Sequence, residues 1–577
     1  MALPAGVRAL SEPARRPVAS PAPIRTQARV ALKRARDRAV ASGTLPDAAL
    51  APEAPQIEID RPADARFGDL ASNVALKLAR TCRMAPLAIA GAIVAELEHE
   101  IAAHPRSSPL AAVEVAPPGF INLRLADHAL EAIVDGVLRA PAEWGRVEPL
   151  RPRSVNVEFV SANPTGPLHI GNARGAFVGD LLSRLLEAGG QTVTREYYFN
   201  DFGMQVRNLG RSVVAIRRGE PVPDDGYHGD YVHDLARDVP PDVAAEAEAG
   251  DAADVIGRWA TERVRGSIEE SLARLGVRFD VWTSESRLHR EGWVDRAIQR
   301  LRENGHVYEQ DGAVWFRSTT FGDDKDRPLI RSTGEPTYLA ADVGYLLDKF
   351  SRGFDHLLYI WGADHHGYIA RTRGAAEGMG FDPARFQVLL TGWVSILRGG
   401  QVVAMSKRAG DIYLLDTLLE EIGNDAARWF FASRGANLDI EVDVELARRQ
   451  SSENPVYYVQ YAHARIASIL RKAGAVGLPP ADSVAGSLSG APEAALARIV
   501  ARLPEVVEDA VLGEETHSIT AYCTELATNF HAFYRDARVV DSDAPERSAK
   551  RLALAEATRV TLANALGLLG ISAPESM

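Results

Sequence analysis

The segment from Val155 to Phe199 constrains the fold of this chain most strongly. A β-rich run, Val155–Val160, leads into a loop of Gly, Pro and Asn residues, and a helical pattern then begins near His169 or Gly171. The helix pattern ends at Gly189-Gly190, a typical C-cap, and a second strand follows at Thr192–Phe199. Strand, loop, helix and strand in this order form the βαβ unit of a parallel sheet. The sequence therefore predicts an α/β protein with a doubly wound parallel sheet.

The rest of the chain divides around that segment. At roughly 100–200 residues per domain, 577 residues predict three or four domains. Helical patterns at about 26–50 and 66–103, with strand-like runs at Val113–Val115 and Phe120–Leu125, predict a small α/β domain over residues 26–146. Residues 147–400 are expected to hold the sheet, and residues 451–577 read as amphipathic helices that form an all-helical bundle.

The sheet pattern is interrupted once inside residues 147–400. Residues from about 215 to 290 are rich in Asp, Glu and Ala with helical periodicity, which indicates an insertion. Strand-like segments return at Ala313–Arg317, His356–Ile360 and Val388–Trp393, and we expect them to continue the sheet. Residues 401–450 form a separate region that begins with a glycine-flanked basic loop.

Composition decides little about partners here. The net charge of −12 argues against nucleic-acid binding when taken alone, but residues 1–40 hold nine Arg and Lys residues against Glu12 and Asp37.

The first 25 residues lack the apolar stretch of a secretory signal, so we expect a disordered leader, with an organelle transit peptide as the alternative. Cys82 and Cys523 are too few for a disulfide framework or a zinc site and fit buried positions in a reducing cytosol. No run approaches the ~20 apolar residues that span a bilayer.

A loop with the chemistry of phosphate binding lies between the first strand and the helix. It runs Pro164-Thr165-Gly166-Pro167-Leu168-His169-Ile170-Gly171-Asn172. Free N–H groups and the helix dipole point outward at this place in a parallel sheet, His can donate to phosphate oxygens, and Gly lets a base approach the backbone. The plain alternative is a turn with a surface histidine.

A second basic loop, Ala404-Met405-Ser406-Lys407-Arg408-Ala409-Gly410, follows Gly399-Gly400. Paired cations on a mobile loop suit a pyrophosphate leaving group, because they can stabilise charge that develops in the transition state. A solvated basic turn is the alternative. The two motifs in this order are more specific than either one.

Together these motifs resemble the signatures of class I aminoacyl-tRNA synthetases. His169-Ile170-Gly171-Asn172 is similar to the HIGH motif with Asn in the last place, and Met405-Ser406-Lys407-Arg408 is similar to KMSKS. Ala404 stands where that loop usually has Lys, and Arg408 where it often has Ser. The resemblance implies a Rossmann-type catalytic domain in which a carboxylate attacks the α-phosphate of ATP and the acyl group then passes to a terminal tRNA hydroxyl.

Further stretches resemble the arginyl-tRNA synthetase family in particular, and the resemblance covers about residues 26–577. They are Glu158–Gly166, Gly362–Tyr368, Asn454–Arg465, Phe67–Asn73 and Leu566–Glu575. The resemblance implies catalytic roles for His169, Lys407 and Arg408. It also implies ATP contacts from a set of loop residues: Pro164, Gly166, His169, Gly171, Asn172, Asp364, His366, Met405, Ser406 and Lys407.

A pocket for arginine needs carboxylates or amide oxygens, because guanidinium is a planar, permanent cation with five donors. Glu158 and Asn163 flank the strand end beside the phosphate loop, the usual ligand position in such sheets. Tyr338 and Asp342 are four residues apart and share one face if their segment is helical. The resemblance assigns Glu158 and Asn163 to the amino and carboxylate groups of the substrate, and Tyr338 and Asp342 to the guanidinium. Asp364 is expected beside both ATP and arginine.

Asp364-His365-His366 also admits a metal site or a phosphoesterase of the Asp-His-His kind, and a loop-stabilising role is a further alternative. Either chemistry would need more clustered acids and histidines elsewhere, and the sequence offers none. We therefore expect ATP with Mg²⁺ and no tightly bound metal.

The resemblance also implies where tRNA(Arg) binds. Residues 26–146 resemble the domain that touches the tRNA elbow, with Phe120 stacking on a D-loop base and Asn122 hydrogen-bonding to it. Residues 401–450 correspond to the signature loop and stem contact, and residues 451–577 to the anticodon-binding domain. There, Tyr461 is the main candidate for stacking, ahead of Tyr457, Tyr458 and Phe533, since aromatic residues at helical spacing are more often core.

The expected protein is a cytoplasmic monomer with L-arginine, ATP and tRNA(Arg) as partners and no membrane. Two rivals remain: another nucleotide-activating enzyme of the same superfamily, and a catalytically dead tRNA-binding relative. The intact His169, Gly171 and Lys407 disfavour the second rival.

Overall fold

A five-stranded parallel sheet forms the centre of the molecule. The computed structural model describes residues 22–149, 151–403, 413–488 and 490–577. The strand order is β11-β10-β4-β5-β6, with all neighbours parallel. The strands are β4 (Ser154–Glu158), β5 (Thr192–Phe199), β6 (Val281–Ser284), β10 (His356–Gly362) and β11 (Phe386–Thr391). The predicted doubly wound α/β fold is confirmed.

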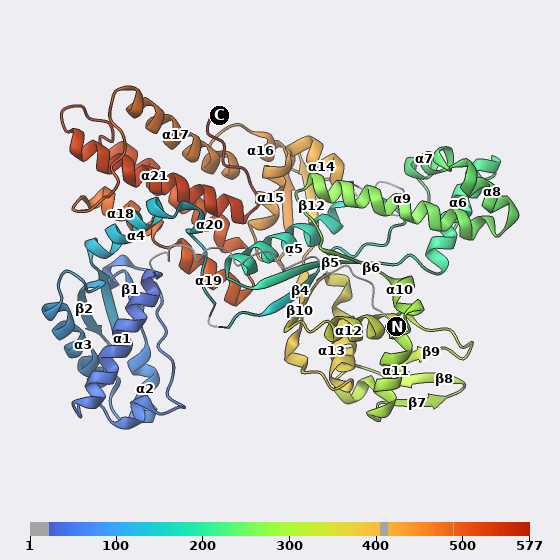
Figure 1. Cartoon of the computed structure of the whole chain (residues 1–577), viewed down its shortest axis with the longest axis horizontal. Helices are drawn as coiled ribbons and strands as arrows, with labels where there is room; N and C mark the ends of the chain where they lie inside the picture. Colours follow the sequence, from blue (N-terminus) through green and yellow to red (C-terminus); the bar gives the residue numbers. More distant parts are fainter. Residues whose placement is uncertain (1–21, 150, 404–412, 489) are drawn as a thin grey trace, which may run out of the picture.

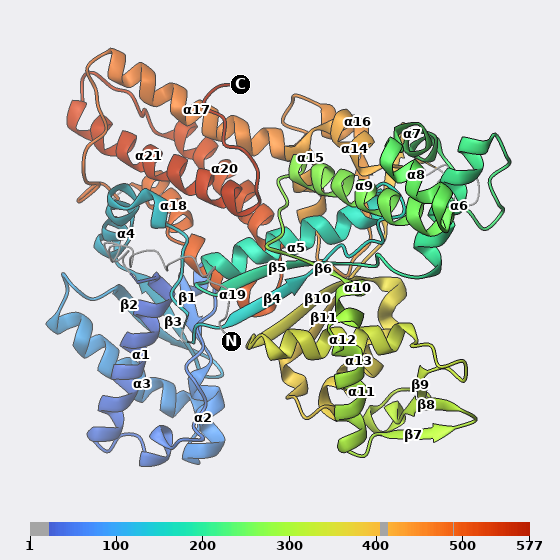
Figure 2. The same ribbon diagram turned by 45° about the vertical axis from the view of Figure 1, so that its right-hand side comes forward.

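The two faces of this sheet differ in chemistry. Val155, Val157 and Phe159 are fully buried and face α5 (Ile170–Ala188), where the absent side chain of Gly179 leaves room for the Phe159 ring. The opposite face carries polar side chains, since Glu158 pairs in register with Glu196 of β5 and with Tyr359 of β10. This face is covered by α12 (Tyr338–Ser351), as Figure 2 shows.

Two expectations about the catalytic region are corrected. The range predicted as an insertion, about 215–290, contains β6, which pairs with β5 at the sheet edge. Four helices lie around that range and pack together to the right in Figure 1: α6 (Met204–Arg218), α7 (Asp230–Asp238), α8 (Pro241–Ala249) and α9 (Ala252–Arg274). The strand predicted at Ala313–Arg317 exists as β8 (Ala313–Phe316), but it belongs to a separate antiparallel sheet with β7 (Val307–Gln310) and β9 (Arg327–Ile330).

Shorter elements complete the catalytic region. The helices on the α12 side are α10 (Glu285–Arg290), α11 (Trp293–Glu303) and α13 (Ile369–Gly378). After the central sheet come β12 (Val394–Arg398), β13 (Gln401–Val402), α14 (Leu415–Ile422), α15 (Asn424–Ala432), β14 (Ile440–Asp443) and α16 (Val444–Arg448). Strands β13, β12 and β14 form a small sheet of their own.

The N-terminal region is an antiparallel sheet covered by helices. Strands β1 (Leu70–Ser72), β3 (Phe120–Leu125) and β2 (Leu110–Ala116) lie in that order. The helices are α1 (Ile24–Ala41), α2 (Val74–Cys82), α3 (Pro86–Ala103) and α4 (Asp127–Arg139). Helix α1 begins at Ile24, one residue before the predicted end of the leader at residue 25, and residues 1–21 lie outside the described part of the chain.

Five helices form the C-terminal region, which confirms the predicted all-helical bundle. They are α17 (Pro455–Ala475), α18 (Ala491–Val500), α19 (Leu503–Gly513), α20 (His517–Asp536) and α21 (Pro545–Leu568). The N-terminal region docks against this bundle through ion pairs that cross more than 400 residues of sequence. These pairs are Arg25–Glu508 at 2.6 Å, Arg25–Asp509 at 2.7 Å, Arg61–Glu505 at 2.9 Å and Arg498–Asp69 at 2.7 Å.

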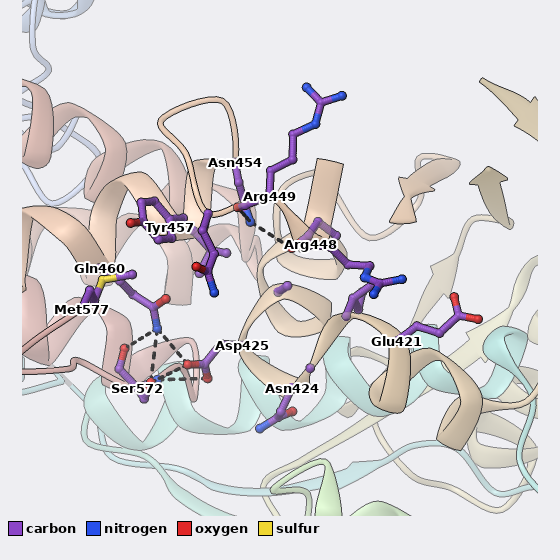
Figure 3. A pocket seen from close by; sticks show the side chains of 16 residues that line it. Glu421, Asn424, Asp425, Arg448, Arg449, Asn454, Tyr457, Gln460, Ser572 and Met577 are labelled. Carbon is purple, nitrogen blue, oxygen red and sulfur yellow. Dashed lines mark hydrogen bonds between the residues drawn. The ribbon is translucent and has the colours of Figure 1, made fainter. Parts of the chain in front are cut away.

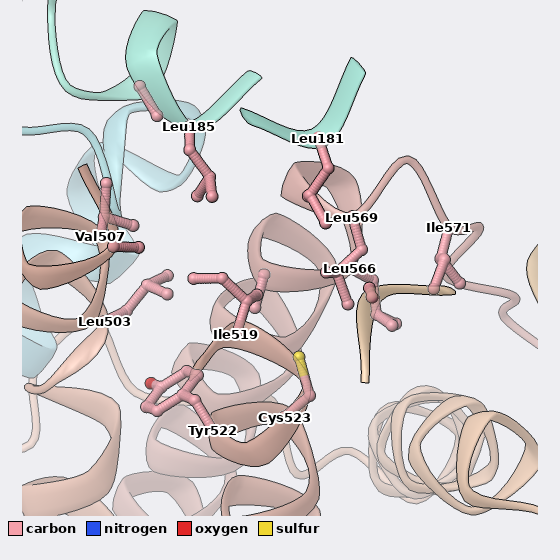
Figure 4. Close-up of a cluster of buried hydrophobic side chains, with 14 of the residues drawn as sticks. Leu181, Leu185, Leu503, Val507, Ile519, Tyr522, Cys523, Leu566, Leu569 and Ile571 are labelled. Carbon is pink, nitrogen blue, oxygen red and sulfur yellow. The ribbon is translucent and has the colours of Figure 1, made fainter. Parts of the chain in front are cut away.

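Helix α5 joins the sheet to the bundle. Its residues Leu181 and Leu185 meet Leu503 and Val507 of α19 and Ile519 of α20 in one buried apolar cluster (Figure 4). Cys523 is buried in the same cluster, and Cys82 is buried too, as expected for free cysteines used as small apolar side chains. The helix that opens at the predicted phosphate loop is therefore fixed at its other end to the bundle.

The described residues include no single helix that is long and apolar enough to cross a membrane. The pair α2 and α3, bent by 117°, passes that test together by length and composition only.

Candidate active site

The predicted phosphate loop opens directly into helix α5. His169 is the N-cap residue, and its Nδ1 accepts a hydrogen bond from the Gly171 N–H at 3.1 Å. The Asn172 Oδ1 accepts from the His169 N–H at 3.2 Å, which completes a reciprocal capping box. The Asn in the last place of the motif therefore has a structural role, because it fixes the backbone that presents His169 at the helix N-terminus.

The described residues that follow the second predicted loop pair with the first loop. Met405, Ser406, Lys407 and Arg408 lie outside the described residues. Beyond that segment, the Ile170 N–H donates to the Tyr413 carbonyl at 3.1 Å, and the Leu415 N–H donates to the Leu168 carbonyl at 3.0 Å. The backbone of residues 413–415, which follows the second motif in the sequence, is thus paired with the HIGH-like loop.

Strand β4 enters the phosphate loop through a strained turn. Val160 and Ser161 have φ angles of 66° and 40°, in the left-handed region that side chains other than glycine rarely adopt. Backbone strain of this kind costs about 1–3 kcal/mol per residue and is concentrated at functional sites. Here it turns the chain sharply at the carboxyl end of β4, where the strand order reverses between β4 and β10.

One face of α12 lies at a cluster of three carboxyl groups, those of Asp342, Glu285 and Glu158, which we name the acidic pocket. The segment is helical, so Tyr338 and Asp342 do share a face, and Tyr338, Asp342, Tyr345 and Lys349 follow one another at spacings of four, three and four residues. Tyr338 is 64% exposed at the rim, whereas Tyr345 and Lys349 are buried at the floor. The stripe therefore runs from solvent to the sheet, with Asp342 part-way down.

Three carboxyl groups meet in this pocket. Burial raises the pKa of Asp342 to about 7, and the nearby carboxylates of Glu285 and Glu158 add to that rise. Arg371 on α13 opposes it. Carboxyl groups held close together repel one another, so a bound cation is favoured because it relieves that repulsion. A guanidinium suits such a site because its five donors lie in a planar fork.

Glu285 was missed by sequence reasoning because it falls in the range taken for an insertion. It follows β6 directly at the start of α10, and the Tyr198 hydroxyl donates to its Oε2 at 2.8 Å. Burial raises the pKa of Glu285, which this hydrogen bond partly offsets. The position was accessible in principle, since a carboxylate directly after a strand of a parallel sheet lies at the ligand-binding edge.

Glu158 lies where it was expected, but it is not free. Its Oε2 is 2.6 Å from the Nζ of Lys349, and its Oε1 accepts a hydrogen bond from the Ser161 hydroxyl at 3.0 Å. Asn163 is exposed on the loop and donates through Nδ2 to Gln205 Oε1 at 2.7 Å. Neither Lys349 nor Gln205 was predicted as a partner from local sequence patterns.

The loop after β10 is open to solvent. The side chains of Asp364 and His365 are 65% and 54% exposed and lie 3.7 Å apart, and His366 is exposed as well. Within the described ranges, no group of three or more His, Cys, Asp or Glu side chains is arranged to hold a metal ion.

Comparison with known proteins decides the family. The chain matches "Arginyl tRNA synthetase N terminal domain" over residues 25–125 and "tRNA synthetases class I (R), catalytic domain" over residues 142–218 and 248–444. It matches "DALR anticodon binding domain" over residues 459–577. The arginine–tRNA ligase of Moorella thermoacetica is 45% identical over 537 residues, which cover 91% of this chain and 94% of that one. The chain belongs to the arginyl-tRNA synthetase family.

Other comparisons agree with this membership. The arginine–tRNA ligase of Geobacillus kaustophilus is 43% identical over 539 residues, covering 92% of this chain and 96% of that one. The structure of Thermus thermophilus arginyl-tRNA synthetase superposes with a TM-score of 0.73 and covers 95% of this chain and 100% of that one; at 24% identity this likeness shows the fold. This arginyl-tRNA synthetase is accordingly a class I aminoacyl-tRNA ligase whose substrates are an amino acid, ATP and tRNA.

The residues expected to contact tRNA lie on β3 of the N-terminal region and on α17 of the helical bundle. Phe120 is 38% exposed at the start of β3, and Asn122, two residues along the same face, is only 6% exposed. In the bundle, Tyr461 is 42% exposed and its ring is nearly parallel to that of Tyr457 at a centroid distance of 6.3 Å. Phe533 is 1% exposed, so the suggestion that it offers a stacking surface is wrong and it is a core residue.

A separate pocket of about 650 Å³ lies where α14, α15 and α16 meet the helical bundle (Figure 3). Arg448, Arg449 and Tyr457 lie on its walls. Gln460 closes one side by donating to Asp425 Oδ2 at 2.8 Å and to the Ser572 carbonyl at 3.0 Å. None of the predicted ATP or arginine contacts within the described residues lines this pocket.

Proposed function

We propose that the crevice at the carboxyl ends of β4 and β10 carries out both steps of arginine charging. L-arginine and ATP give arginyl-adenylate and pyrophosphate, and the arginyl group then passes to the 3′-terminal adenosine of tRNA(Arg) with release of AMP. One observation carries this proposal: Asp342, Glu285 and Glu158 converge beside the loop that ends at His169, the N-cap residue of α5. A cation-selective pocket next to a phosphate-type loop is the arrangement that arginine activation requires.

The ATP contacts are assigned to the two loops. Pro164, Gly166, Gly171 and Asn172 shape the backbone around the helix N-terminus, where the positive end of the helix dipole favours phosphate. His169 donates to the phosphates as negative charge develops. In the second loop, Met405 and Ser406 lie against the nucleotide, and Lys407 and Arg408 stabilise the leaving pyrophosphate. The loop after β10 adds Asp364 and His366.

The arginine contacts are divided between the two ends of the substrate. Glu158 and Asn163 bind its amino and carboxylate groups, with Asp364 close by, while Asp342 and Tyr338 bind the guanidinium. Charged hydrogen bonds contribute roughly 1.5–3 kcal/mol each. Two or three of them supply the ~5.5 kcal/mol that a 10⁴-fold preference over lysine needs. No editing domain is required on this argument.

Mg²⁺ enters this scheme with the nucleotide. It is commonly held by substrate phosphates with one or two carboxylates and several waters, and does not need an all-protein cage. Bound Mg²⁺ would neutralise phosphate charge, and the residues above would orient the substrates.

The outer regions are assigned to tRNA. Residues 26–146 hold the elbow through Phe120 and Asn122, residues 401–450 contact the stem, and residues 451–577 hold the anticodon, with Tyr461 stacking on a base. Residues 147–400 form the catalytic domain. The protein is proposed to act as a monomer in the cytoplasm.

The test is charging of total tRNA by the purified protein with ATP, Mg²⁺ and each amino acid supplied separately. Incorporation of arginine alone is expected. Incorporation of a different amino acid would keep the fold and chemistry and discard the pocket assignment. No charging at all would favour a relative that binds tRNA without catalysis.

A further inference from the structure

Lys349 is a fully buried cation on the floor of the acidic pocket. None of its side chain is exposed, and its Nζ lies 2.6 Å from Glu158 Oε2. The same ammonium lies 4.0 Å from the centre of the Tyr359 ring and 4.5 Å from that of Tyr345. Burying an ammonium group is costly unless it is paired. The ion pair with Glu158 and the contacts with the two aromatic rings therefore offset the cost of burying the ammonium, and they do so only while Lys349 keeps this position.

This pairing fixes the orientation of the Glu158 carboxylate. Lys349 holds Oε2, while the Ser161 hydroxyl donates to Oε1. Ser161 is itself held in place, because its Oγ accepts from the Tyr198 N–H at 3.2 Å and its backbone has a left-handed φ. The Oε2 atom of Glu158 is therefore paired with Lys349. Its Oε1 atom faces the strained loop that leads to Asn163.

We propose that Lys349 is a positioning residue for amino-acid binding, which clamps the Glu158 carboxylate so that a single oxygen faces the amino group of the substrate. This inference rests on the role proposed above for Glu158. Lys349 does not touch the substrate in this scheme and acts through the carboxylate that it holds.

Stability alone does not account for a lysine at this position. A buried ion pair is commonly no more stabilising than well-packed apolar residues of similar volume, and often less. The rest of the α12 face that covers the sheet is rich in apolar residues, and Leu346 and Phe350, on either side of Lys349 along α12, are buried core residues. Two well-packed apolar residues in place of the Lys349–Glu158 pair would fill the same space at lower cost, so the pair is explained better by the orientation that Lys349 gives to Glu158.

The ammonium also balances charge across the pocket. Burial alone would raise the pKa of Glu196, but the positive charges of Lys349 and Arg352 together lower it. By compensating Glu158, Lys349 leaves Asp342 and Glu285 as the carboxyl groups available to the guanidinium end. The two ends of arginine would then meet differently charged parts of one pocket.

A double-mutant cycle with Lys349→Met and Glu158→Gln tests the proposal. We measure KM for arginine and for ATP in tRNA charging, together with the melting temperature of each variant. Lys349→Met is expected to raise the arginine KM about tenfold, as misdirecting one charge-assisted hydrogen bond should, and to leave the ATP KM unchanged. Glu158→Gln should raise the arginine KM at least as much, and the double variant should match Glu158→Gln alone.

Arg352→Gln is the matched control. Arg352 lies on the same buried network and donates to Glu196 at 2.9 Å without touching Glu158. Removing it should lower the melting temperature and leave the arginine KM as in the wild type. A Lys349→Met variant that behaves in the same way would show that Lys349 is structural only and would overturn the inference.

Two further outcomes separate this inference from the proposal beneath it. If the rise in arginine KM in the double variant equals the product of the rises in the two single variants, Lys349 acts independently of Glu158. An unchanged arginine KM in Glu158→Gln would remove the role proposed for Glu158 itself. If Lys349→Met does not fold, the double variant lacks both buried charges and can be compared directly with Glu158→Gln. Equal arginine KM values support the clamp, and a further rise contradicts it.

Discussion

Replacing Asp342 by Asn tests the guanidinium pocket with little change in shape. The substitution keeps the size of the side chain and removes the charge that pairs with the substrate. A guanidinium fork can make two charged hydrogen bonds to one carboxylate, each worth roughly 1.5–3 kcal/mol. Their loss corresponds to a rise in arginine KM of about 10² to 10⁴-fold, so we expect at least a hundredfold rise in tRNA-charging assays.

The pH dependence of the same variant adds a second, independent readout. Because the Asp342 carboxyl has a pKa of about 7, it is largely neutral at pH 6 and ionised at pH 8. The arginine KM of the wild type should therefore fall by up to about tenfold per pH unit below 7 and level off above it. The Asp342→Asn variant should lose this dependence.

The stability of the empty protein should respond in the opposite sense. A carboxyl group whose pKa is raised from 3.8 to about 7 on folding stabilises the protein only while it is protonated in the folded state. The free energy of unfolding should thus decrease as pH rises from 4 to 7, by up to about 4 kcal/mol from this group. At pH 8 without arginine, Asp342→Asn should melt no lower than the wild type. An unchanged arginine KM, or a KM rise accompanied by a much lower melting temperature, would refute this reasoning.

Three other substitutions separate catalysis, scaffold and tRNA binding. His169→Ala should lower kcat for charging about 10² to 10³-fold and leave the arginine KM nearly unchanged, because the imidazole donates to phosphate charge that develops during the reaction. Single-turnover charging measures this effect, and a large rise in arginine KM would count against that role. Arg428→Met should destabilise the fold by about 3–5 kcal/mol, measured as a lower melting temperature, since the Asp180 carboxylate loses its buried partner and keeps only the more exposed Arg184, at 2.8 Å, and Arg195, at 3.9 Å; Asp180→Asn in the same chain should recover part of the loss. Phe120→Ala should raise the tRNA KM about 5- to 150-fold, the range of one lost stacking contact, while the arginine KM stays constant; an equal tRNA KM would remove Phe120 from the elbow contact.

Local patterns predicted the elements around the phosphate loop well. The strand at Thr192–Phe199 and the strand at Phe120–Leu125 have the predicted bounds, and α5 begins between the two predicted starting points. The helical spacing of Tyr338 and Asp342 was also correct. In each case the periodicity of a single segment carries the information, so no knowledge of distant contacts is needed.

The failures share a different cause, because each depends on contacts between segments far apart in the chain. Strand β6 has four residues and lies among long helices, so its pairing with β5 is invisible in local periodicity, and Glu285 was missed with it. The segment at Ala313–Phe316 was a strand, as predicted, but its sheet partners are β7 and β9. The Lys349–Glu158 pair joins residues 191 positions apart. Pairing and burial of this kind are tertiary properties.

The central claim is that the pocket beside the HIGH-like loop selects arginine by the charge of its guanidinium. The most direct test compares the arginine KM with the inhibition constant of citrulline, a neutral analogue of the same shape, in charging by the wild type at pH 8 and pH 6. Arginine should be favoured at least about a hundredfold at pH 8, since its charged hydrogen bonds are lost in citrulline, and less at pH 6, where Asp342 is largely protonated. Equal affinities for the two compounds, or a preference independent of pH, would contradict the account.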